Sequence, residues 1–476
     1  MSLCLRLELW VPWLAALAWG CADATGPVLG DTPSPPSPAP LPPVPTPDQL
    51  AWQTQELTAF LHFGMDTFTN QEQGDGTASP SLFAPTALDA SQWMTTLRAA
   101  GFGEAMLTAK HFDGFCLWPS NCTDYTVAAS SWLDGEGDVV RQFVDAAHEA
   151  NLRVGLALSP LDHHDPTYGT PAYYSVFTCQ LTELLTNYGA IDEMWLWDDP
   201  ASAPAFDWSA VHELVHQLQP HALLDLGGIA MVAGSDVRSV AEALPAAPPA
   251  DQPSVEVVPG SASPAPIWYP AEAVYSDRPG WFWHASEDTQ VASLTQLLEY
   301  YYDSVGRNSV FRLNVPPNTQ GLLASPDVAA LQAYGPAMAS IYQTNFAEGQ
   351  SASADSTFDG LPAYDVSKAV DGDFDTFWAA GEDATTARLE VDLGATRTFN
   401  VVSLQEPIGL GERTTQHSVA AQSNGSWTTI ATGTVIGERK LHRVGTITAN
   451  RIALVITQAR GAPAIAEIGA YASPYP

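Results

Sequence analysis

Apolar runs and helical patterns alternate along the chain from about residue 48 to residue 345. The runs are six or seven residues long, and most precede a segment whose apolar residues recur at helical spacing. Repeated strand-then-helix units of this kind predict a parallel sheet. The strand candidates are Ala59–Gly64, Glu104–Lys110, Arg153–Ser159, Asp192–Trp197, Ala222–Gly227 and Val310–Val315.

The number of these units and their apolar strands favour a closed (β/α)8 barrel, at residues 48–345, over an open sheet. In such barrels the reacting groups lie in loops that leave the C-terminal strand ends. From about Ser351 the helical spacing disappears, and alternating segments such as "ARLEVDLG" and "RIALVITQA" are separated by Gly, Asn and Pro. Residues 351–476 are therefore predicted to form an antiparallel β-sandwich.

The first 21 residues have the pattern of an export signal. Arg6 precedes an apolar run, Leu9–Ala18, which is too short to span a bilayer. Cys21 follows Ala-Trp-Gly, which resembles a bacterial lipoprotein cleavage site, although Trp19 is atypical there. Two alternatives stay open: a lipid anchor at Cys21, or simple secretion in which Cys21 has no role. Both predict a secreted or cell-surface protein.

Residues 22–47 are rich in proline and are predicted to form an extended, polyproline-like tether that does not pack. No later segment is long and apolar enough to predict a membrane span. Acidic residues outnumber basic ones by 53 to 18, for a formal net charge of −35. Such a charge repels phosphate backbones, so nucleic acid is not expected as a partner.

Three cysteines remain once Cys4 and Cys21 are set aside. An odd number does not make a disulfide framework. Cys116 and Cys122 flank a loop and are candidates for a bridge in an oxidising compartment, and buried free thiols are the alternative, also for Cys179. The spacing of these cysteines with histidine matches no zinc pattern, so no metal site is predicted.

Several predicted strand ends carry chemically reactive groups. His62 ends the first strand and Glu72 lies in the next loop, while "KHFDGFCLWPS" brings His111 and Trp118 after the second. Asp198 and Asp199 follow "DEMWLW". Later segments add Glu272 in "WYPAE" and Trp281 in "RPGWFWH".

Each of these residues alone has an ordinary structural explanation, such as a core tryptophan or an aspartate that starts a turn. Together they suit a sugar, because aromatic rings stack on apolar pyranose faces while His, Glu and Asp bond its hydroxyls. Glycosidic cleavage requires two carboxyl groups. No Walker loop or Gly-rich dinucleotide motif is present, and the barrel implies no cofactor.

The segment "KHFDGFCLWPS…TDY" resembles a signature of bacterial α-L-fucosidases, a retaining glycoside hydrolase family. "HFGMDTFTNQEQGDG", "QLTELLTNYGAIDEMW", "PAE…RPGWFWH", "YYDSVGRN" and "LNVPP" match in order, over about residues 52–342. The resemblance implies a (β/α)8 barrel that removes fucose from oligosaccharides or glycoconjugates. It also implies that six residues contact the sugar: His62, Glu72, His111, Trp118, Trp195 and Trp281.

The expected nucleophile is an aspartate at the end of the fourth strand, in a pattern like "DEVWFDG". Aligned without gaps, this chain has Trp197 at that position and Asp198 one residue later. Side chains alternate between the two faces of a strand, so a slip of one residue turns the carboxylate away. A bulge would restore its aim. Asp198 is therefore the nucleophile if the strand bulges; otherwise Trp197 has replaced it.

The pocket departs from the family pattern at three further positions, where this chain has Phe112, Gln73 and Ala243. Glu242 lies one residue before the usual acid/base position, and Glu272 is a second candidate for that role. The main hypothesis is an exo-acting, retaining α-L-fucosidase with Asp198 as nucleophile and Glu242 or Glu272 as acid/base. The alternative is a degenerate barrel that binds glycans at a cell surface without cleaving them.

The predicted β-sandwich resembles discoidin-type (coagulation factor type C) domains in "DGDFDTFW", "LEVDLG" and "FNVVSLQEPIGLGER". Such domains often bind carbohydrate. Asp371, Asp373 and Asp375 offer oxygen ligands for calcium, and the alternative is a solvated turn. Trp427 is a candidate for stacking on sugar, but packing in the core is the expected role.

Overall fold

The computed structural model describes residues 36–196, 206–227, 235–241, 250–257 and 265–475. Pro38–Pro476 form one compact unit. The predicted signal segment, Trp197, Asp198, Glu242 and Ala243 lie outside the described residues. None of the helices in the described ranges has the length and apolar character needed to cross a membrane.

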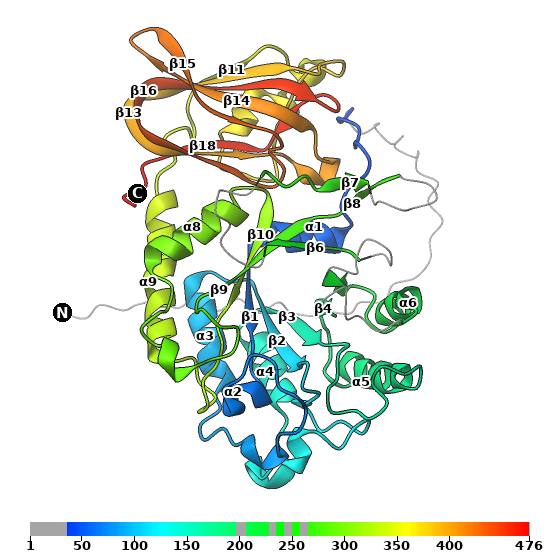
Figure 1. Ribbon diagram of the computed structural model, residues 1–476. Coiled ribbons are helices and arrows are strands. Elements are labelled where there is room, and N and C mark those ends of the chain that lie inside the picture. Colours follow the sequence, from blue (N-terminus) through cyan, green and yellow to red (C-terminus); the bar gives the residue numbers. More distant parts are fainter. Residues whose placement is uncertain (1–35, 197–205, 228–234, 242–249, 258–264, 476) are drawn as a thin grey trace, which may run out of the picture. The chain divides into compact units, whose positions relative to one another are not determined.

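The first half of the unit is built on an eight-stranded sheet in which all neighbouring strands are parallel. The spatial order is β5-β4-β3-β2-β1-β10-β9-β6, with helices outside the sheet (Figure 1). This confirms the predicted barrel. The strands are β1 (Leu57–Leu61), β2 (Glu104–Lys110), β3 (Arg153–Leu158), β4 (Glu193–Trp195), β5 (Leu223–Asp225), β6 (Arg238–Ala241), β9 (Ala271–Ser276) and β10 (Ser309–Asn314).

A seam without ladder pairing separates β5 from β6, so the barrel is nearly rather than fully closed. Side chains replace part of the missing ladder. The backbone N–H of Leu224 donates to Asp236 Oδ2 at 2.9 Å, and Asp236 N–H donates to the Leu224 carbonyl at 2.8 Å. The Ser239 hydroxyl also donates to Asp225 Oδ2 at 3.1 Å across the seam. The edges of both strands are thereby partly satisfied.

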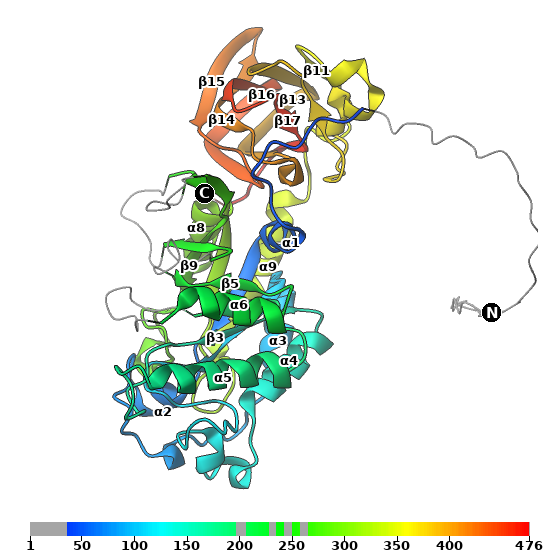
Figure 2. The ribbon, with the colours of Figure 1, turned by 90° about the vertical axis from the view of Figure 1, so that its right-hand side faces the viewer.

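The helices start where the sequence provides caps. Asp89, Asp138 and Asp207 precede α3, α4 and α6, and each carboxylate accepts a backbone N–H of the first turn. Figure 2 shows α5 and α6 side by side on the outside of the sheet. The helices are α1 (Pro47–Thr54), α2 (Met65–Thr69), α3 (Ala90–Ala100), α4 (Val139–Glu149), α5 (Tyr173–Asn187), α6 (Trp208–Leu218), α8 (Leu294–Ser304) and α9 (Ser325–Tyr342).

The barrel interior holds a buried ionic network around Arg312 of β10. Its guanidinium donates to Glu193 Oε1 and Oε2 at 2.7 Å and to Glu272 Oε2 at 2.8 Å, and all three side chains are fully buried. Asp225 lies beside Glu272, and burial and that like charge raise the pKa of Asp225 well above its usual value. Arg312 also lies 5.4 Å from the ring of Trp195, which connects this network to the sheet's C-terminal edge.

Residues beyond about 351 form the predicted antiparallel β-sandwich, whose main sheet has the order β11-β13-β16-β14-β15, with β18 paired to β13. Two predicted strands, "ARLEVDLG" and "TFNVVSLQEP", are one bent strand, β13, because register shifts between Asp392 and Arg397 absorb the Gly-containing turn. The strands are β11 (Ala352–Ala354), β13 (Ala387–Gln405), β14 (Thr414–Ser423), β15 (Ser426–Gly433), β16 (Lys440–Ala459) and β18 (Glu467–Tyr471); β12 (Trp378–Ala379) pairs β17 (Ala464–Ile465), and β7 (Val255–Val257) pairs β8 (Pro266–Trp268).

The structure describes the surroundings of Trp427 and Asp371 in the sandwich. Trp427 is half-buried, not in the core, and the Arg388 guanidinium lies 4.7 Å from its ring, because alternation along β15 turns it outward. The Asp371 carboxylate accepts hydrogen bonds from the Thr376 hydroxyl and the Lys368 ammonium. The calcium site at Asp371, Asp373 and Asp375 stays a prediction.

The last part of the proline-rich segment packs, contrary to the expectation of a free tether. Leu41 N–H donates to the Leu410 carbonyl at 2.8 Å, and the Ala39 carbonyl accepts from Arg413 at 2.6 Å. Extended proline-rich chain leaves its carbonyls free to accept such bonds. Gly411 has a φ of +87°, and a side chain there would meet the Leu41 carbonyl. Glycine at this position therefore allows the proline-rich segment to pack closely.

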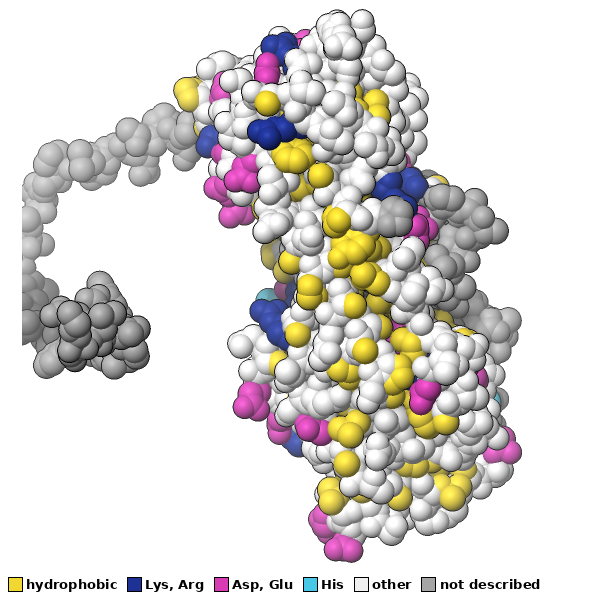
Figure 3. All heavy atoms as spheres, turned by 90° about the vertical axis from the view of Figure 1, so that its left-hand side faces the viewer, with side chains coloured by type: hydrophobic (Ala, Val, Ile, Leu, Met, Phe, Trp, Pro, Cys, Tyr) yellow, Lys and Arg dark blue, Asp and Glu magenta, His cyan; other side chains and the backbone are white. Residues whose placement is uncertain are grey.

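The disulfide joins Cys122 to Cys179, and Cys116 is a buried free thiol. The candidate Cys116–Cys122 bridge is therefore wrong, and the free-thiol alternative holds for Cys116 but not for Cys122 or Cys179. Cys116 is fully buried and forms isolated β-bridges with Lys110 and Thr126, whereas Cys122 is joined to Cys179 of α5. The acidic excess is dispersed: on the face shown in Figure 3, Asp and Glu side chains lie at several separate places.

Candidate active site

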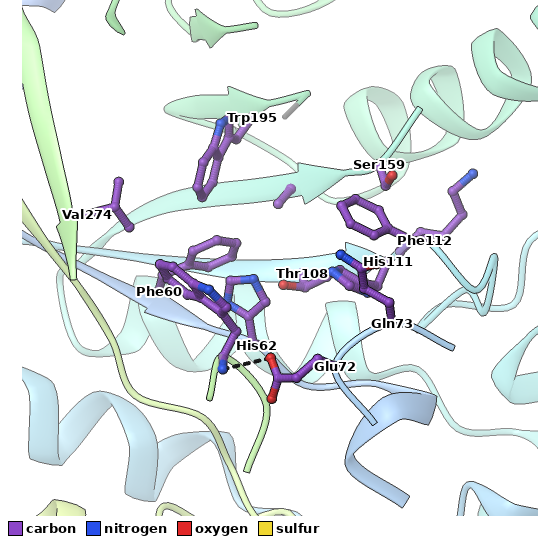
Figure 4. A pocket seen from close by; sticks show the side chains of 13 residues that line it. Phe60, His62, Glu72, Gln73, Thr108, His111, Phe112, Ser159, Trp195 and Val274 are labelled. Atoms are coloured by element: carbon purple, nitrogen blue, oxygen red, sulfur yellow. Dashed lines mark hydrogen bonds between the residues drawn. The ribbon is translucent and has the colours of Figure 1, made fainter. Parts of the chain in front are cut away.

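A cavity opens at the C-terminal ends of β1 to β4, where a barrel of this type places its chemistry. Figure 4 shows Trp195 and Val274 on one side and Glu72, Gln73 and His111 on the other, with His62 between them. Polar and apolar walls therefore face each other. The lining residues are Phe60, His62, Glu72, Gln73, Thr108, Lys110, His111, Phe112, Ala157, Ser159, Trp195, Val274 and Trp281.

His62 follows β1 and is held in one tautomer by Asn314, the last residue of β10. Asn314 Nδ2 donates to Ser276 Oγ at 2.9 Å and to the Trp281 carbonyl at 2.8 Å, which fixes Oδ1 toward His62. Oδ1 accepts from His62 Nδ1 at 2.9 Å. Burial, with the nearby His111, lowers the pKa of His62 to about 3. The ring is therefore neutral at pH 7, and its Nε2 is left as a hydrogen-bond acceptor.

His111 follows β2 and is oriented by a carboxylate from α2. Asp66 Oδ2 accepts a hydrogen bond from His111 Nδ1 at 3.0 Å. Gly74 approaches both carboxylates of this region: a methyl group there would lie 2.5 Å from Asp66 Oδ1 and 2.9 Å from Asp113 Cβ. Phe112 stacks on the His111 ring at 4.2 Å between centroids. The chain thus fixes the imidazole on two sides.

Glu72 lies in the loop after α2 and binds the segment that follows β9. Its Oε2 accepts from Trp281 N–H at 2.9 Å, the dashed line of Figure 4, and its Oε1 accepts from Phe282 N–H at 3.3 Å. His284 Nε2 lies 2.6 Å from Oε1. These bonds place the Trp281 ring at the cavity, 5.4 Å from the His62 ring. Glu72 therefore shapes the cavity as well as lining it.

The apolar wall consists of Phe60, Trp195 and Val274, with Trp281 packed against them. The Phe60 and Trp195 rings lie 4.7 Å apart. Rings and a branched aliphatic side chain suit the C–H face of a pyranose, whereas the imidazoles and the carboxylate opposite suit its hydroxyls. The arrangement can hold a single sugar ring that has both an apolar and a polar side.

Five of the predicted sugar-contacting residues meet in this cavity: His62, Glu72, His111, Trp195 and Trp281. The sixth, Trp118, is fully buried elsewhere, where its Nε1 donates to Glu183 of α5 at 2.9 Å. Two predicted catalytic residues, Asp198 and Glu242, lie outside the described residues, so their roles stay predictions.

Glu272 lies inside the barrel rather than in the cavity wall. It is the second residue of β9, and its carboxylate is bonded to Arg312 and Ser239. Glu272 was a candidate acid/base, but it lies at the start of β9, toward the end of the strand opposite the chemistry. Asn314 and Asp66 were missed as site residues. Both stand in quoted motifs, "LNVPP" and "HFGMDTF", but their contacts come from long-range folding.

Comparison with known proteins gives two matching families. The family described as alpha-L-fucosidase matches residues 49–340, and the F5/8 type C domain matches residues 351–468. Alpha-L-fucosidase 1 of Arabidopsis thaliana is 38% identical over 453 residues, covering 92% of this chain and 89% of its own. A rice protein (Oryza sativa subsp. japonica) is 40% identical over 461 residues, covering 93% and 88%.

Solved structures agree with these matches. A GH29 fucosidase of Ruminococcus gnavus in complex with fucose superposes with a TM-score of 0.83 at 29% identity, covering 93% of this chain and 97% of its own. The structure named SpGH29 gives 0.83 at 31% identity, covering 92% and 100%. The similarity thus spans both domains, and this chain belongs to the α-L-fucosidase family.

Proposed function

We propose that this protein is an exo-acting α-L-fucosidase that removes a terminal fucose from glycans. The cavity carries this proposal, because a terminal fucosyl residue has three free hydroxyls and an apolar methyl group, and the walls offer partners for both. His62 Nε2 accepts a hydrogen bond from one hydroxyl, and His111 and Glu72 bond the others. Phe60 and Trp195 lie against the apolar face of the ring.

The proposed reaction retains configuration at the anomeric carbon. The Asp198 carboxylate attacks that carbon while Glu242 protonates the departing glycosidic oxygen, which gives a fucosyl-enzyme ester. Glu242 then removes a proton from water, and the hydroxide displaces Asp198 to release fucose. Support for Asp198 is its position in the sequence, one residue after the nucleophile position of the family pattern and three residues after the cavity-lining Trp195.

The test is hydrolysis of an aryl α-L-fucoside by the wild type, Asp198→Ala and the matched control Asp199→Ala. We expect Asp198→Ala to lose several orders of magnitude in kcat, because the covalent route is removed, and Asp199→Ala to keep most activity. NMR of the first product should show the α-anomer. If the wild type binds fucosylated oligosaccharides but does not hydrolyse them, the proposal of an enzyme is overturned and the glycan-binding alternative is favoured.

We also propose that the protein is exported and held at a cell surface through lipid on Cys21. Support comes from the apolar run Leu9–Ala18 and from the Cys122–Cys179 disulfide, since such bonds persist mainly in oxidising compartments. Mass spectrometry of the mature N-terminus checks this proposal. A chain that starts at Cys21 with a diacylglyceryl mass supports it, whereas an unmodified Cys21 contradicts the anchor.

A further inference from the structure

Three groups of potential metal ligands come together in the described part of the chain: Cys122, Cys179 and Glu183; Glu193, Asp225 and Glu272; and His212, His216 and Asp236. The two cysteines of the first group are joined in a disulfide. In the second group the Arg312 guanidinium already pairs with Glu193 and Glu272. The third group has two imidazoles and one carboxylate, and none of the ion pairs in the described part of the chain joins it to a Lys or Arg side chain.

The two histidines lie one turn apart on α6, in the segment His-Glu-Leu-Val-His. Residues four apart share one face of a helix, so both rings point the same way, with their centroids 4.3 Å apart. His216 Nε2 lies 3.2 Å from Asp236 Oδ2. One donor atom from each of the three residues lies within 4.8 Å of the others.

Asp236 is held firmly in place by the seam between β5 and β6. Its carboxylate accepts from Leu224 N–H, its own N–H donates to the Leu224 carbonyl, and its carbonyl accepts from Gln49 Nε2 at 2.8 Å. Bonds of this kind around a ligating carboxylate are typical of metal sites, because they fix its orientation. The ligand that comes from outside the helix is thus pre-positioned.

We propose that His212, His216 and Asp236 bind a divalent transition-metal ion of the zinc class, with water as the fourth ligand. Zinc accepts nitrogen and carboxylate oxygen at about 2.0–2.2 Å in tetrahedral sites, which places neighbouring donors roughly 3.3 Å apart. The His216–Asp236 distance of 3.2 Å already matches. Two imidazoles disfavour magnesium and calcium, which prefer oxygen.

The charges around the cluster favour a bound cation. Asp236 brings a carboxylate beside the two imidazoles, and its Oδ2 lies 3.2 Å from His216 Nε2. His216 and Asp236 keep 28% and 24% of their side-chain surface exposed, so an ion has access.

A bound ion would join α6 to the seam of the barrel. None of its three ligands lines the cavity, and Glu213, which follows His212, is exposed. The proposed role is therefore to stabilise the fold, not to add a second reaction, and it does not depend on the fucosidase proposal. In Figure 2, α6 lies on the outer side of β5, where the ion would sit.

The test uses the full chain without a polyhistidine tag, stripped with a chelator and titrated with Zn²⁺ by calorimetry. We expect one ion per chain and a rise in Tm of about 3 °C at a hundredfold excess over Kd. Co²⁺ should give the visible absorption of a tetrahedral site. His212→Gln should weaken binding at least about tenfold.

The matched control is His221→Gln, because His221 is exposed, pairs with Asp48 and lies outside the cluster. It should bind zinc as the wild type does. His212→Gln spares Asp236, so the seam and the chelator-treated Tm should stay unchanged. The proposal is overturned if zinc does not bind, or if His212→Gln and His216→Gln bind it as tightly as the wild type.

Discussion

The hydrogen bond from His62 Nδ1 to Asn314 Oδ1 is the contact on which the acceptor role of His62 depends. Asn314→Leu removes this acceptor while keeping a side chain of similar size. The Nδ1 proton then loses its partner, and the ring is free to take the tautomer in which Nε2 carries hydrogen. In that tautomer His62 Nε2 has no free lone pair and cannot accept a hydrogen bond from a sugar hydroxyl.

Leaving one buried polar group unpaired costs about 1–3 kcal/mol. If this cost falls on the transition state, kcat/KM drops by about 5- to 150-fold, since each 1.36 kcal/mol is a factor of ten. The assay is kcat/KM for an aryl α-L-fucoside at pH 7, with Tm measured in parallel to exclude unfolding.

Ser276→Ala is the matched control for Asn314→Leu. It removes an acceptor for Asn314 Nδ2 but leaves the His62 contact and the bond to the Trp281 carbonyl in place. We expect a smaller loss, below about fivefold. A folded Asn314→Leu protein with wild-type kcat/KM would refute the argument that Asn314 sets the tautomer of His62.

Three further predictions concern stability. Burial lowers the pKa of His62 to about 3, so between pH 6.5 and 3 the unfolded state binds a proton that the folded state does not bind. The free energy of unfolding should therefore fall by up to roughly 5 kcal/mol over this pH range. Urea titrations should show a smaller fall for His62→Asn. The Cys122–Cys179 bond closes a loop with a sequence separation of 57, so the double serine variant should lose about 4 kcal/mol, and reductant should lower the Tm of the wild type alone. Glu272→Ala should cost about 3–5 kcal/mol by leaving Arg312 underpaired, while the folded fraction keeps its kcat; loss of kcat at unchanged Tm would instead make Glu272 catalytic.

The sequence was sufficient for the barrel because its strands are short apolar runs with helices between them. The resemblance to the family was sufficient for five cavity residues, and four of them, His62, Glu72, His111 and Trp281, also belong to the groups noted at predicted strand ends, which meet at one edge of a parallel barrel. The sequence did not place Glu272, because the segment around "WYPAE" was not recognised as the start of a strand, and β9 begins directly after Pro270. Helix caps and the alternation of side chains along a strand depend on neighbouring residues and can be recognised in the sequence. The ends of strands in proline-rich segments depend on contacts with distant residues and cannot.

Contacts between segments far apart in the chain could not be predicted from the sequence, because they depend on how helices and strands pack. Cys179 lies on α5, and only the packing of that helix against the loop after β2 selects it over Cys116 as the partner of Cys122. The His212–His216 spacing is visible in the sequence, but Asp236 comes from the far side of β5. Asn314 meets His62 because β10 and β1 are neighbours in the sheet.

The seam between β5 and β6 has a consequence for how the cylinder moves. A ladder of backbone bonds fails only when many links break together. In the described part of the chain this junction is held instead by the backbone bond from Asp236 to Leu224 and by the side chains of Asp236 and Ser239. Slow opening should therefore start there, so amide hydrogens of β5 and β6 should exchange with deuterium before those of β1 and β2. Local opening of the barrel would therefore be confined to the seam between β5 and β6.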